Sequence, residues 1–485
     1  MKTHHFDLVI LGASGDLVLK KLFPSLLIAL SQHEINVKSR IFLCSRKVKD
    51  SKQFKAAFYQ KLQTTIDDKS LFNKRLWQAL EKRLFPVEID ITKQAQWADL
   101  AGCLSQKLPC PVIFYLALPP RLYSPCLDSI NAVNLGSWPN KIVLEKPVGH
   151  SFQTASNLMN KAQTLFAPSQ LFFIDHYLAK ETVLNLQVLR FSNILFKNFW
   201  DPNLIDHIQI SINETGGVRG RAEYYNEAGA LKDMVQSHLL QLLSIIAMDI
   251  PNELTADAIH AEKIKVLKAL KPLDEADIRS HCVRGQYVAG VQNDQLEVGY
   301  LEDVQLPKSN TETFVALKVH IDNWQWAKTP FYLRTGKRLH QKKAQIVIQF
   351  KDVPHNLFTG KQAEMTPNRL IIQLQPEEKL QLSVMAKNMT DGEDKLKTAV
   401  LDFNFTDHIP QYRSYAYKRL LIDIFQENHQ HFPCKEEIEL AWKWIDPIIA
   451  AWQQNTASLM LYRAGTAGPH SAEALLAKDG RSWVD

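Results

Sequence analysis

The sequence lacks any apolar run long enough to cross a bilayer, and it contains no low-complexity block and no internal repeat. These absences argue against a membrane-spanning protein and against a solenoid. Basic residues form no tail, and a net charge of +6 over 485 residues is modest. Such a charge suits the local binding of anionic metabolites better than binding to nucleic acid. We therefore expect neither a nucleic acid nor a membrane as a partner.

Cysteine is also scarce, and no two cysteines form a Cys-x-x-Cys pair or stand at a spacing typical of metal ligands. The six are Cys44, Cys103, Cys110, Cys126, Cys282 and Cys434. We accordingly predict no metal site. The first residues, MKTHHFDLVI, lead directly into a predicted strand. Both features are typical of a protein of the reducing cytoplasm.

Short apolar runs alternate with amphipathic helical stretches up to about residue 178. The runs are FDLVIL, RIFLCS, FPVEIDI, VIFYLAL, KIVLEK and LFFIDH. This alternation predicts a doubly wound α/β domain with a parallel, Rossmann-like sheet over residues 1–178. A helix is expected at 180–191, and further strand-like runs then follow: HIQISIN, TFVALKVHID, PFYLRTG, AQIVIQF, RLIIQLQP and LQLSVMA. With helices expected near 231–248, 415–425 and 436–452, residues 179–485 read as a larger α+β domain on a mostly antiparallel sheet.

The stretch VILGASGDLVLKKL, residues 9–22, resembles a nucleotide-binding turn. Gly12, Ser14 and Gly15 are small enough for the backbone to approach a diphosphate closely. Val18 stands where the common fingerprint has its third glycine or alanine, so the helix and the strand must accommodate a larger side chain. The pattern therefore fits either a dinucleotide site or an ordinary tight turn from strand to helix.

Residues at the ends of two later strands help to predict which nucleotide binds and where. Ser45 and Arg46 follow the second predicted strand, where folds specific for NAD usually carry an acidic residue. A cation there favours a phosphorylated ribose, although Arg46 also fits a solvated charge at a strand end. FYLALPP closes another strand with Pro119 and Pro120, at the sheet edge where nucleotides bind in open α/β folds.

Several motifs occur in the order seen in glucose-6-phosphate dehydrogenases. They are GASGDL (12–17), YLALPP (115–120), EKPVG (145–149), IDHYLAKE (174–181), YYNEAGALKDMVQSHLLQLL (224–243), FYLRTGKRL (331–339), LQP (374–376) and YAYKRLLIDIF (415–425). The chain thus resembles this family over nearly its whole length, and the pairing of IDHYL-x-KE with D-x-x-x-x-H-L-L-Q is its most specific part. The resemblance implies NADP-dependent oxidation of D-glucose 6-phosphate at C1 to 6-phospho-D-glucono-1,5-lactone, in the oxidative pentose phosphate pathway, by a homodimer or homotetramer.

The resemblance also assigns binding residues. For NADP they are Gly12, Ala13, Ser14, Gly15, Asp16, Leu17, Lys21, Ser45, Arg46, Tyr115, Leu118, Pro119, Glu145 and Lys146. For glucose 6-phosphate they are Lys146, His176, Tyr177, Lys180, Glu214, Asp233, Lys337, Lys342 and Gln375. From the residues alone, His176, Tyr177 and Lys180 stand at a strand-to-helix junction that suits an anion. Glu214 alone reads as a surface carboxylate, and the lysines near 337–343 read as a solvated cluster. The family pattern further suggests a cis bond before Pro147.

Oxidation at C1 requires a base for the hydroxyl proton, and histidine suits this task because its ordinary pKa lies near neutrality. His238 is the candidate, although a core or capping histidine is the alternative on sequence alone. Asp233 precedes it by five residues, which in an α-helix leaves the two side chains about 140° apart around the axis. The resemblance instead implies that Asp175 orients His238.

The chain departs from the family pattern at three positions. Ala179 replaces a glycine and Ser237 an asparagine, whereas Gln373 replaces an arginine that helps animal relatives bind a second NADP. We therefore expect only the catalytic NADP site. Two alternatives remain open from the sequence: a related sugar oxidoreductase that acts on another hexose, and a non-catalytic NADPH-binding or scaffolding protein. Retention of Asp175, Lys180, Asp233 and His238 argues against the second.

Overall fold

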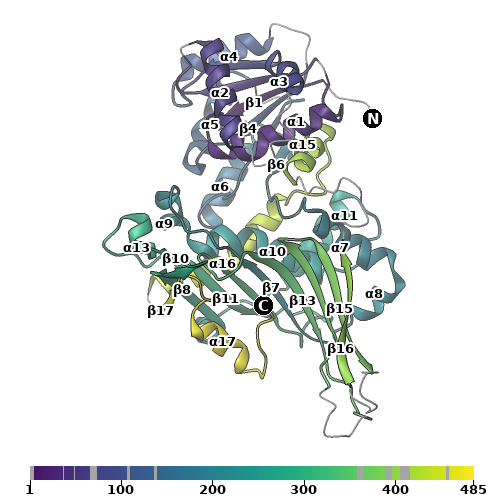
Figure 1. Cartoon of the computed structure of the whole chain (residues 1–485). Coiled ribbons are helices and arrows are strands. Elements are labelled where there is room, and N and C mark those ends of the chain that lie inside the picture. Colours follow the sequence, from purple (N-terminus) through teal and green to yellow (C-terminus); the bar gives the residue numbers. More distant parts are fainter. Residues whose placement is uncertain are drawn as a thin grey trace. The chain divides into compact units, whose positions relative to one another are not determined.

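The computed structural model describes residues 5–36, 38–48, 50–65, 74–105, 110–135, 139–357, 365–387, 396–404, 416–454 and 458–485. The chain divides into two compact units (Figure 1). The first comprises Met1–Ala179, Glu253–His260 and Tyr415–Glu439, and the second comprises Lys180–Asn252, Ala261–Ser414 and Leu440–Asp485. The first long break thus falls one residue from the predicted boundary at 178/179, while two later segments cluster with the first unit. The division of the chain into domains 1–178 and 179–485 stays a prediction.

The first unit contains a six-stranded parallel sheet in the order β3-β2-β1-β4-β5-β6. Its strands are β1 (Asp7–Leu11), β2 (Arg40–Ser45), β3 (Leu84–Glu88), β4 (Val112–Leu116), β5 (Lys141–Leu144) and β6 (Leu171–Phe173). The helices between them are η1 (Val18–Leu22), α1 (Phe23–Ser31), α2 (Ser51–Thr65), α3 (Lys74–Glu81), α4 (Gln94–Ser105), η3 (Pro120–Leu122), α5 (Tyr123–Ala132), α6 (Phe152–Gln163) and η4 (Pro168–Gln170). The central strands are buried along their whole length, as in sheets covered on both faces. The predicted doubly wound fold is confirmed, and its strand order reverses between β1 and β4.

A segment from far along the sequence completes the core of this unit. Helix α15 (Ala416–Gln426) packs beside α1, and the rings of Phe6 and Phe425 stack with their centroids 4.0 Å apart. The buried Lys141 ammonium donates to the carbonyl of Ile424 at 3.3 Å and pairs with Glu427 at 3.0 Å. The Rossmann-like sheet therefore depends on residues that the sequence pattern places elsewhere.

The second unit is built on a nine-stranded sheet in the order β16-β15-β14-β13-β7-β12-β11-β8-β17, and a separate hairpin joins β9 to β10. The strands are β7 (Ile205–Asn213), β8 (Cys282–Val288), β9 (Gly290–Gln292), β10 (Gln295–Glu297), β11 (Phe314–Val319), β12 (Phe331–Gly336), β13 (Lys343–Phe350), β14 (Arg369–Gln375), β15 (Lys379–Lys387), β16 (Leu396–Asn404) and β17 (Leu459–Arg463). Two neighbouring pairs, β7 with β12 and β8 with β17, are parallel and the others are antiparallel. The expectation of a mostly antiparallel sheet is confirmed, although the sequence analysis missed β8, β16 and β17.

The helices of the second unit include those expected at 180–191, 231–248 and 436–452, together with others that the sequence analysis did not predict. They are α7 (Glu181–Ser192), α8 (Ile194–Phe199), α9 (Ala222–Ala230), η5 (Leu231–Leu239), α10 (Leu240–Ala247), α12 (Glu275–His281), α13 (Tyr300–Val304) and α17 (His470–Ala477), while α11 (Ala256–Lys268) and α16 (Lys435–Gln453) contain residues of both units. The expected α-helix at 231–248 is wrong in its first half, because η5 is a π-helix with i→i+5 hydrogen bonds.

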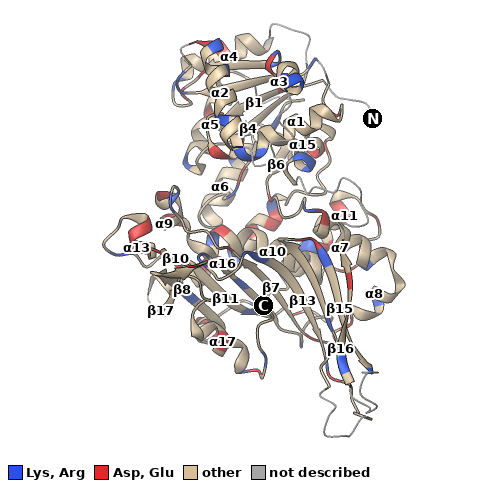
Figure 2. Ribbon diagram, in the orientation of Figure 1, with Lys and Arg blue, Asp and Glu red and all other residues tan. Residues whose placement is uncertain are grey.

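Charged residues of both signs are interspersed over the ribbon of each unit (Figure 2). In the described part of the chain, no helix combines the length and the apolar character that a membrane crossing requires.

Candidate active site

The turn after β1 needs its first glycine. Gly12 has φ +86°, and a Cβ at this position would overlap the carbonyl oxygen of Ala117 just beyond β4. The N–H groups of Gly12 and Ala13 both donate to the carbonyl of Cys44, at 3.1 and 3.0 Å. The turn is thus fixed against its two neighbouring strands, while Ser14 and Gly15 remain exposed. An exposed turn of small residues at the point where the strand order reverses fits a dinucleotide diphosphate.

The remaining predicted nucleotide residues of the first unit surround this turn. Val18 is fully buried and opens the π-helix η1, so the turn accommodates a valine at the third fingerprint position. The hydroxyl oxygens of Ser14 and Ser45 lie 3.0 Å apart, which places the end of β2 beside the turn. Arg46 follows there with an exposed side chain. Asp16 and Lys21 are exposed, Leu17 packs against the core, and Leu118 and Pro119 follow the end of β4.

Glu145 lies in a buried group of tyrosines. The Tyr115 hydroxyl donates to its carboxylate at 2.5 Å, Tyr417 also hydrogen-bonds this carboxylate, and the Tyr123 hydroxyl donates to the Glu145 carbonyl at 2.9 Å. Burial raises the pKa of Glu145 to about 7, although Tyr115, the positive charge of Lys146 and Tyr417 act in the opposite direction. Tyr115, one of the predicted NADP residues, is itself buried, and its hydroxyl binds Glu145. The following peptide bond, Lys146–Pro147, is cis as the family pattern suggested.

Asp175 begins the turn after β6. Its carboxylate accepts the N–H of Tyr177 at 3.0 Å, and its carbonyl accepts the N–H of Leu178 at 3.1 Å. The ring of His176 has its centroid 4.8 Å from that of Tyr177 and 6.0 Å from that of Tyr417. Tyr417 therefore contacts both the Glu145 group and the predicted phosphate-binding turn. Sequence reasoning missed it, because the YAYKRLL motif was recognised but its partners lie far away in sequence.

Lys180 is buried and immediately precedes α7, so the predicted strand-to-helix junction is present. Glu378, on the turn between β14 and β15, caps this helix. Its carboxylate accepts the N–H of Thr182 at 2.8 Å and also bonds the Thr182 hydroxyl. Gln375 ends β14 just before it. No sequence signal pointed to Glu378, because a cap supplied from another element has no local pattern.

Glu214 and Lys337 meet at the ends of two neighbouring strands. Because β7 and β12 are parallel, their carboxyl ends share one sheet edge, and Glu214 forms an ion pair with Lys337 there. Lys337 is buried, and its ammonium lies 5.4 Å from the centroid of the Tyr225 ring. Neither residue is therefore an isolated surface charge. Lys342 is different, since it is exposed on the turn before β13.

Tyr225 marks the centre of this charged group. Its phenol has a pKa raised well above the usual value, mainly by burial and further by the negative charges of Asp233, Glu312 and Glu214. Tyr224 donates to the Asp233 carboxylate at 3.1 Å. The second unit thus gathers Asp233, Glu214 and Lys337 into one polar group, which can bind several hydroxyls of a sugar.

Helix η5, which carries Asp233 and His238, begins at a break in the chain. Gly229 has φ +65°, and a Cβ there would overlap the carboxylate of Glu312. The Glu312 carboxylate accepts the N–H of Leu231 at 2.9 Å, and its carbonyl accepts the N–H of Ala230 at 3.0 Å. Burial raises the pKa of Glu312. Sequence reasoning missed this residue, because it precedes a strand some eighty positions downstream.

The π-helix changes the geometric argument about the base. In an α-helix, the side chains of residues i and i+5 point in different directions around the axis. In a π-helix, i→i+5 hydrogen bonds place these two residues about one turn apart, so their side chains lie on the same side of the helix. The reason for excluding Asp233 as the partner of His238 therefore does not hold in η5. Both residues are buried, at 5% and 1% exposure. Asp175 and Asp233 both stand as candidate partners of the base.

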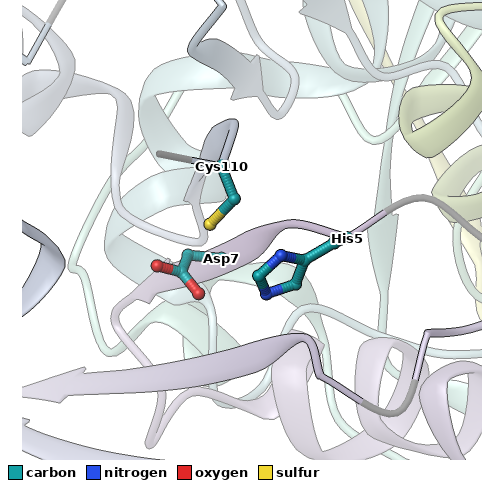
Figure 3. Close-up of side chains that lie close together, drawn as sticks. All are labelled: His5, Asp7 and Cys110. Atoms are coloured by element: carbon teal, nitrogen blue, oxygen red, sulfur yellow. The ribbon is translucent and has the colours of Figure 1, made fainter. Parts of the chain in front are cut away.

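Two groups of potential metal ligands lie within the first unit. In one, His5 and Cys110 flank the Asp7 carboxylate (Figure 3). Arg40 binds both oxygens of that carboxylate, through Nε at 2.9 Å and through Nη2. Burial and Asp7 raise the pKa of the Cys110 thiol to about 11, which keeps it protonated at neutral pH. A metal ion would have to displace Arg40 and this proton, so the group reads as an ion-pair network.

The second group joins His260, Cys434 and Glu437, in which His260 Nδ1 lies 2.6 Å from a Glu437 carboxylate oxygen. This hydrogen bond links α11 to the first turn of α16. It explains the proximity of the two side chains without an ion.

A doubly wound sheet with a glycine turn at its switch point, beside an exposed arginine, is typical of nucleotide-dependent oxidoreductases. Comparison of the sequence with models of known protein families specifies the class further. Residues 9–185 match the family model "Glucose-6-phosphate dehydrogenase, NAD binding domain", and residues 187–484 match "Glucose-6-phosphate dehydrogenase, C-terminal domain". The chain belongs to the glucose-6-phosphate dehydrogenase family.

Individual relatives agree with the family models. The chain is 39% identical to a glucose-6-phosphate 1-dehydrogenase of Rhizobium meliloti (strain 1021) over 480 residues, which cover 99% of this chain and 98% of the relative. It is 38% identical to that of Mycolicibacterium smegmatis, covering 98% and 97%. Among solved structures, a glucose-6-phosphate dehydrogenase in complex with its substrate glucose-6-phosphate matches with TM-score 0.88 and 28% identity, covering 100% of this chain and 99% of that chain.

The break before η5 can be tested by adding one methyl group. Gly229→Ala should destabilise folding by roughly 2–4 kcal/mol, because it combines left-handed backbone strain with displacement of Glu312. The matched control is Gly220→Ala, where φ is +88° but nothing lies within 4 Å of the new Cβ. Urea unfolding should show a loss of only about 1 kcal/mol for the control. Equal losses would contradict the role assigned to the Glu312 contact.

The buried Glu145 predicts a pH dependence of stability. Its folded pKa, about 7, exceeds the ordinary 4.5, so its protonation favours the folded state. This stabilisation is complete below about pH 4.5 and is lost as the pH rises through 7. From pH 5.5 to pH 8, the free energy of unfolding of the wild type should therefore fall by about 2 kcal/mol relative to that of Glu145→Gln. Glu88→Gln, at an exposed carboxylate on β3, should leave the wild-type pH dependence intact; the same response from both variants would refute the assignment.

Proposed function

We propose that this chain oxidises D-glucose 6-phosphate at C1 to 6-phospho-D-glucono-1,5-lactone with NADP as the acceptor, the first step of the oxidative pentose phosphate pathway. The observation that carries the proposal is the match of both family models, which together span residues 9–185 and 187–484. The direct test is the absorbance of reduced nicotinamide with glucose 6-phosphate or with glucose. Faster turnover of unphosphorylated glucose would favour a different sugar oxidoreductase.

The first unit supplies the nucleotide site. The turn of Gly12, Ser14 and Gly15 would hold the diphosphate, while Ser45 and Arg46 would bind the ribose phosphate that distinguishes NADP from NAD. The hydrogen bond between Ser14 and Ser45 supports this arrangement, because it brings the two parts of the site together. NADP, when bound, accepts the hydride that leaves C1.

The sugar is assigned to three groups of residues. Glu214, Asp233 and Lys337 lie around Tyr225 and would bind hydroxyls. The sugar phosphate would be bound by His176 and Tyr177, on the turn after β6, and by Lys180, at the start of α7. The contributions of Lys146, Lys342 and Gln375 rest on the family resemblance alone.

The proton of the C1 hydroxyl goes to His238 as the hydride leaves. A carboxylate partner would orient the imidazole and stabilise its charged form. Asp175 is the partner that the family pattern implies, and Asp233 is the partner that the π-helical geometry newly permits. Asp175 belongs to the first unit and His238 to the second. The choice between the two carboxylates is therefore best made by measurement.

We also infer a cytoplasmic homo-oligomer, a dimer or a tetramer. The cytoplasm is supported by six cysteines that form no disulfide, which is typical of reducing compartments. The oligomer is inferred from the family resemblance, and light scattering would measure its size.

The cofactor assignment predicts a selective defect. Arg46→Ala should weaken NADP far more than NAD, by about 1.5–3 kcal/mol or roughly 10- to 100-fold, since it removes a charge-assisted contact to the ribose phosphate. Steady-state kinetics with both cofactors measure this difference. Lys47→Ala, at the neighbouring exposed residue, serves as the control and should change both cofactors little. An equal loss of affinity for NADP and NAD in Arg46→Ala would show that Arg46 is only a solvated charge at a strand end.

The base predicts a loss of turnover without a loss of binding. His238→Asn should lower kcat by at least roughly 10²- to 10⁴-fold, while both ligands bind within a few-fold of the wild type. Asp175→Asn should also slow turnover. The double variant, Asp175→Asn with His238→Asn, should be little slower than His238→Asn alone, because the effects of residues that act as a unit are not additive.

The same cycle with Asp233→Asn decides between the two partners. If Asp233 binds sugar hydroxyls, its substitution should mainly raise the KM for glucose 6-phosphate and should multiply the loss of His238→Asn. Non-additivity of Asp233 with His238, together with additivity of Asp175, would assign Asp233 as the partner instead.

A further inference from the structure

A cavity of about 460 Å³ lies beside the start of η5, entirely within the second unit. Its wall comes from the end of α9 and the start of η5, from β8, from residues 308–312 and from the last turns of α16. This volume is within the range of pockets that bind small metabolites. Glu214, Asp233, His238 and Lys337 do not line it, so it is separate from the proposed sugar site.

The charges around the cavity favour an anion. Lys232, Arg284 and Lys308 contribute three positive charges against the two carboxylates of Glu227 and Glu312. Arg284 is only 5% exposed. A cationic guanidinium kept inside a cavity of this size is well placed to pair with a ligand oxyanion.

The indole of Trp452 gives a second and independent indication. Its Nε1 is buried and finds no hydrogen-bond acceptor within the part of the chain that the structure describes. Five other buried indoles donate to backbone carbonyls: Trp97, Trp200, Trp326, Trp444 and Trp483. An indole N–H is a donor only, and leaving it unmet in the interior is costly. Trp452 lines the cavity, and Arg284 lies 5.6 Å from the centroid of its ring.

We propose that this cavity binds a small multivalent oxyanion, a phosphorylated or polycarboxylate metabolite, at a site distinct from that of the substrate. Oxygen atoms of the ligand would accept the N–H of Trp452 and pair with Arg284 and Lys308. The phosphate and carboxylate forms share this chemistry, and binding experiments with one probe of each kind separate them.

The position of the cavity gives the ligand a route to the reaction. Gly229 and Glu312 line the cavity, and Glu312 also holds the start of η5 through the N–H of Leu231. An anion beside Arg284 changes the electrostatic environment of the Glu312 carboxylate and hence its hold on η5. Since η5 carries Asp233, occupancy should alter the KM for glucose 6-phosphate. This last step rests on the proposed function, whereas binding itself does not.

The binding test uses isothermal titration calorimetry on the full chain with inorganic pyrophosphate and, separately, with citrate. Glucose 6-phosphate and NADPH are present at saturation, so that the proposed phosphate sites of substrate and cofactor are filled. We expect one site per chain. Trp452→Phe keeps the ring but removes the donor, and Lys308→Gln removes an exposed cation. Each should weaken binding roughly tenfold.

A matched control removes a lysine from another cavity. Lys52, with Lys55 and Lys82, lines a cavity of about 770 Å³ between α2 and α3 of the first unit. Lys52→Gln should leave the affinity unchanged. Absence of saturable binding by either anion, or binding that survives both Trp452→Phe and Lys308→Gln, would overturn the proposal. Tighter binding of pyrophosphate assigns a phosphorylated ligand, and tighter binding of citrate assigns a polycarboxylate.

The regulatory step has its own readout. The anion that binds should shift the KM for glucose 6-phosphate in the wild type, and Trp452→Phe should abolish the shift. A shift that persists in Trp452→Phe indicates competition at the substrate phosphate site and overturns the regulatory step. A chain that binds the anion calorimetrically but does not oxidise glucose 6-phosphate supports the site and refutes the proposed function.

Discussion

The second unit depends on how residues 312 and 313 are held between its helices and its sheet. Glu312 accepts the first N–H groups after the break at Gly229, while Thr313 donates its N–H to Gly285 at 2.7 Å and accepts that of Lys337 at 2.9 Å. One short segment therefore fixes η5 relative to β8 and to the end of β12. The polar group around Tyr225 depends on this constraint, because Asp233 comes from η5 and Lys337 from the end of β12, while Glu214 follows the neighbouring strand β7.

Both units solve the problem of burying a carboxylate near a ligand site in the same way. Glu145 is surrounded by tyrosine hydroxyls, and Glu312 by backbone N–H groups. In each case burial raises the pKa of the carboxyl group, because the charged form loses its solvation. Glu214, whose side chain is 35% exposed, is held differently, since it lies beside the ammonium of Lys337. Neutral donors thus hold the two buried carboxylates in place, whereas a buried cation holds the partly exposed Glu214.

Sequence reasoning succeeded where the signal was local. The six strands of the first unit were all predicted, because each is a short apolar run bounded by turn residues, and Gly12 was identified because only a strand-to-helix turn explains its neighbours. It failed where the structure depends on distant partners or on hydrogen-bond register. The helix expected near 231–248 is an example, because a helical sequence pattern cannot distinguish the i→i+5 bonding of η5 from the i→i+4 bonding of α10. Glu312, Glu378 and Tyr417 act on segments far from their own, and no local pattern records such contacts.

The assembly of the first unit from separate segments has a consequence for biosynthesis. Leu420, Leu421, Ile424 and Phe425 belong to the same hydrophobic core as Leu26 and Phe6. While the ribosome is still translating the second unit, the Rossmann-like sheet lacks this part of its core and leaves an apolar face uncovered. The nascent chain must therefore keep an incomplete nucleotide-binding sheet from aggregating until α15 emerges, which makes this interval the natural point for chaperone engagement.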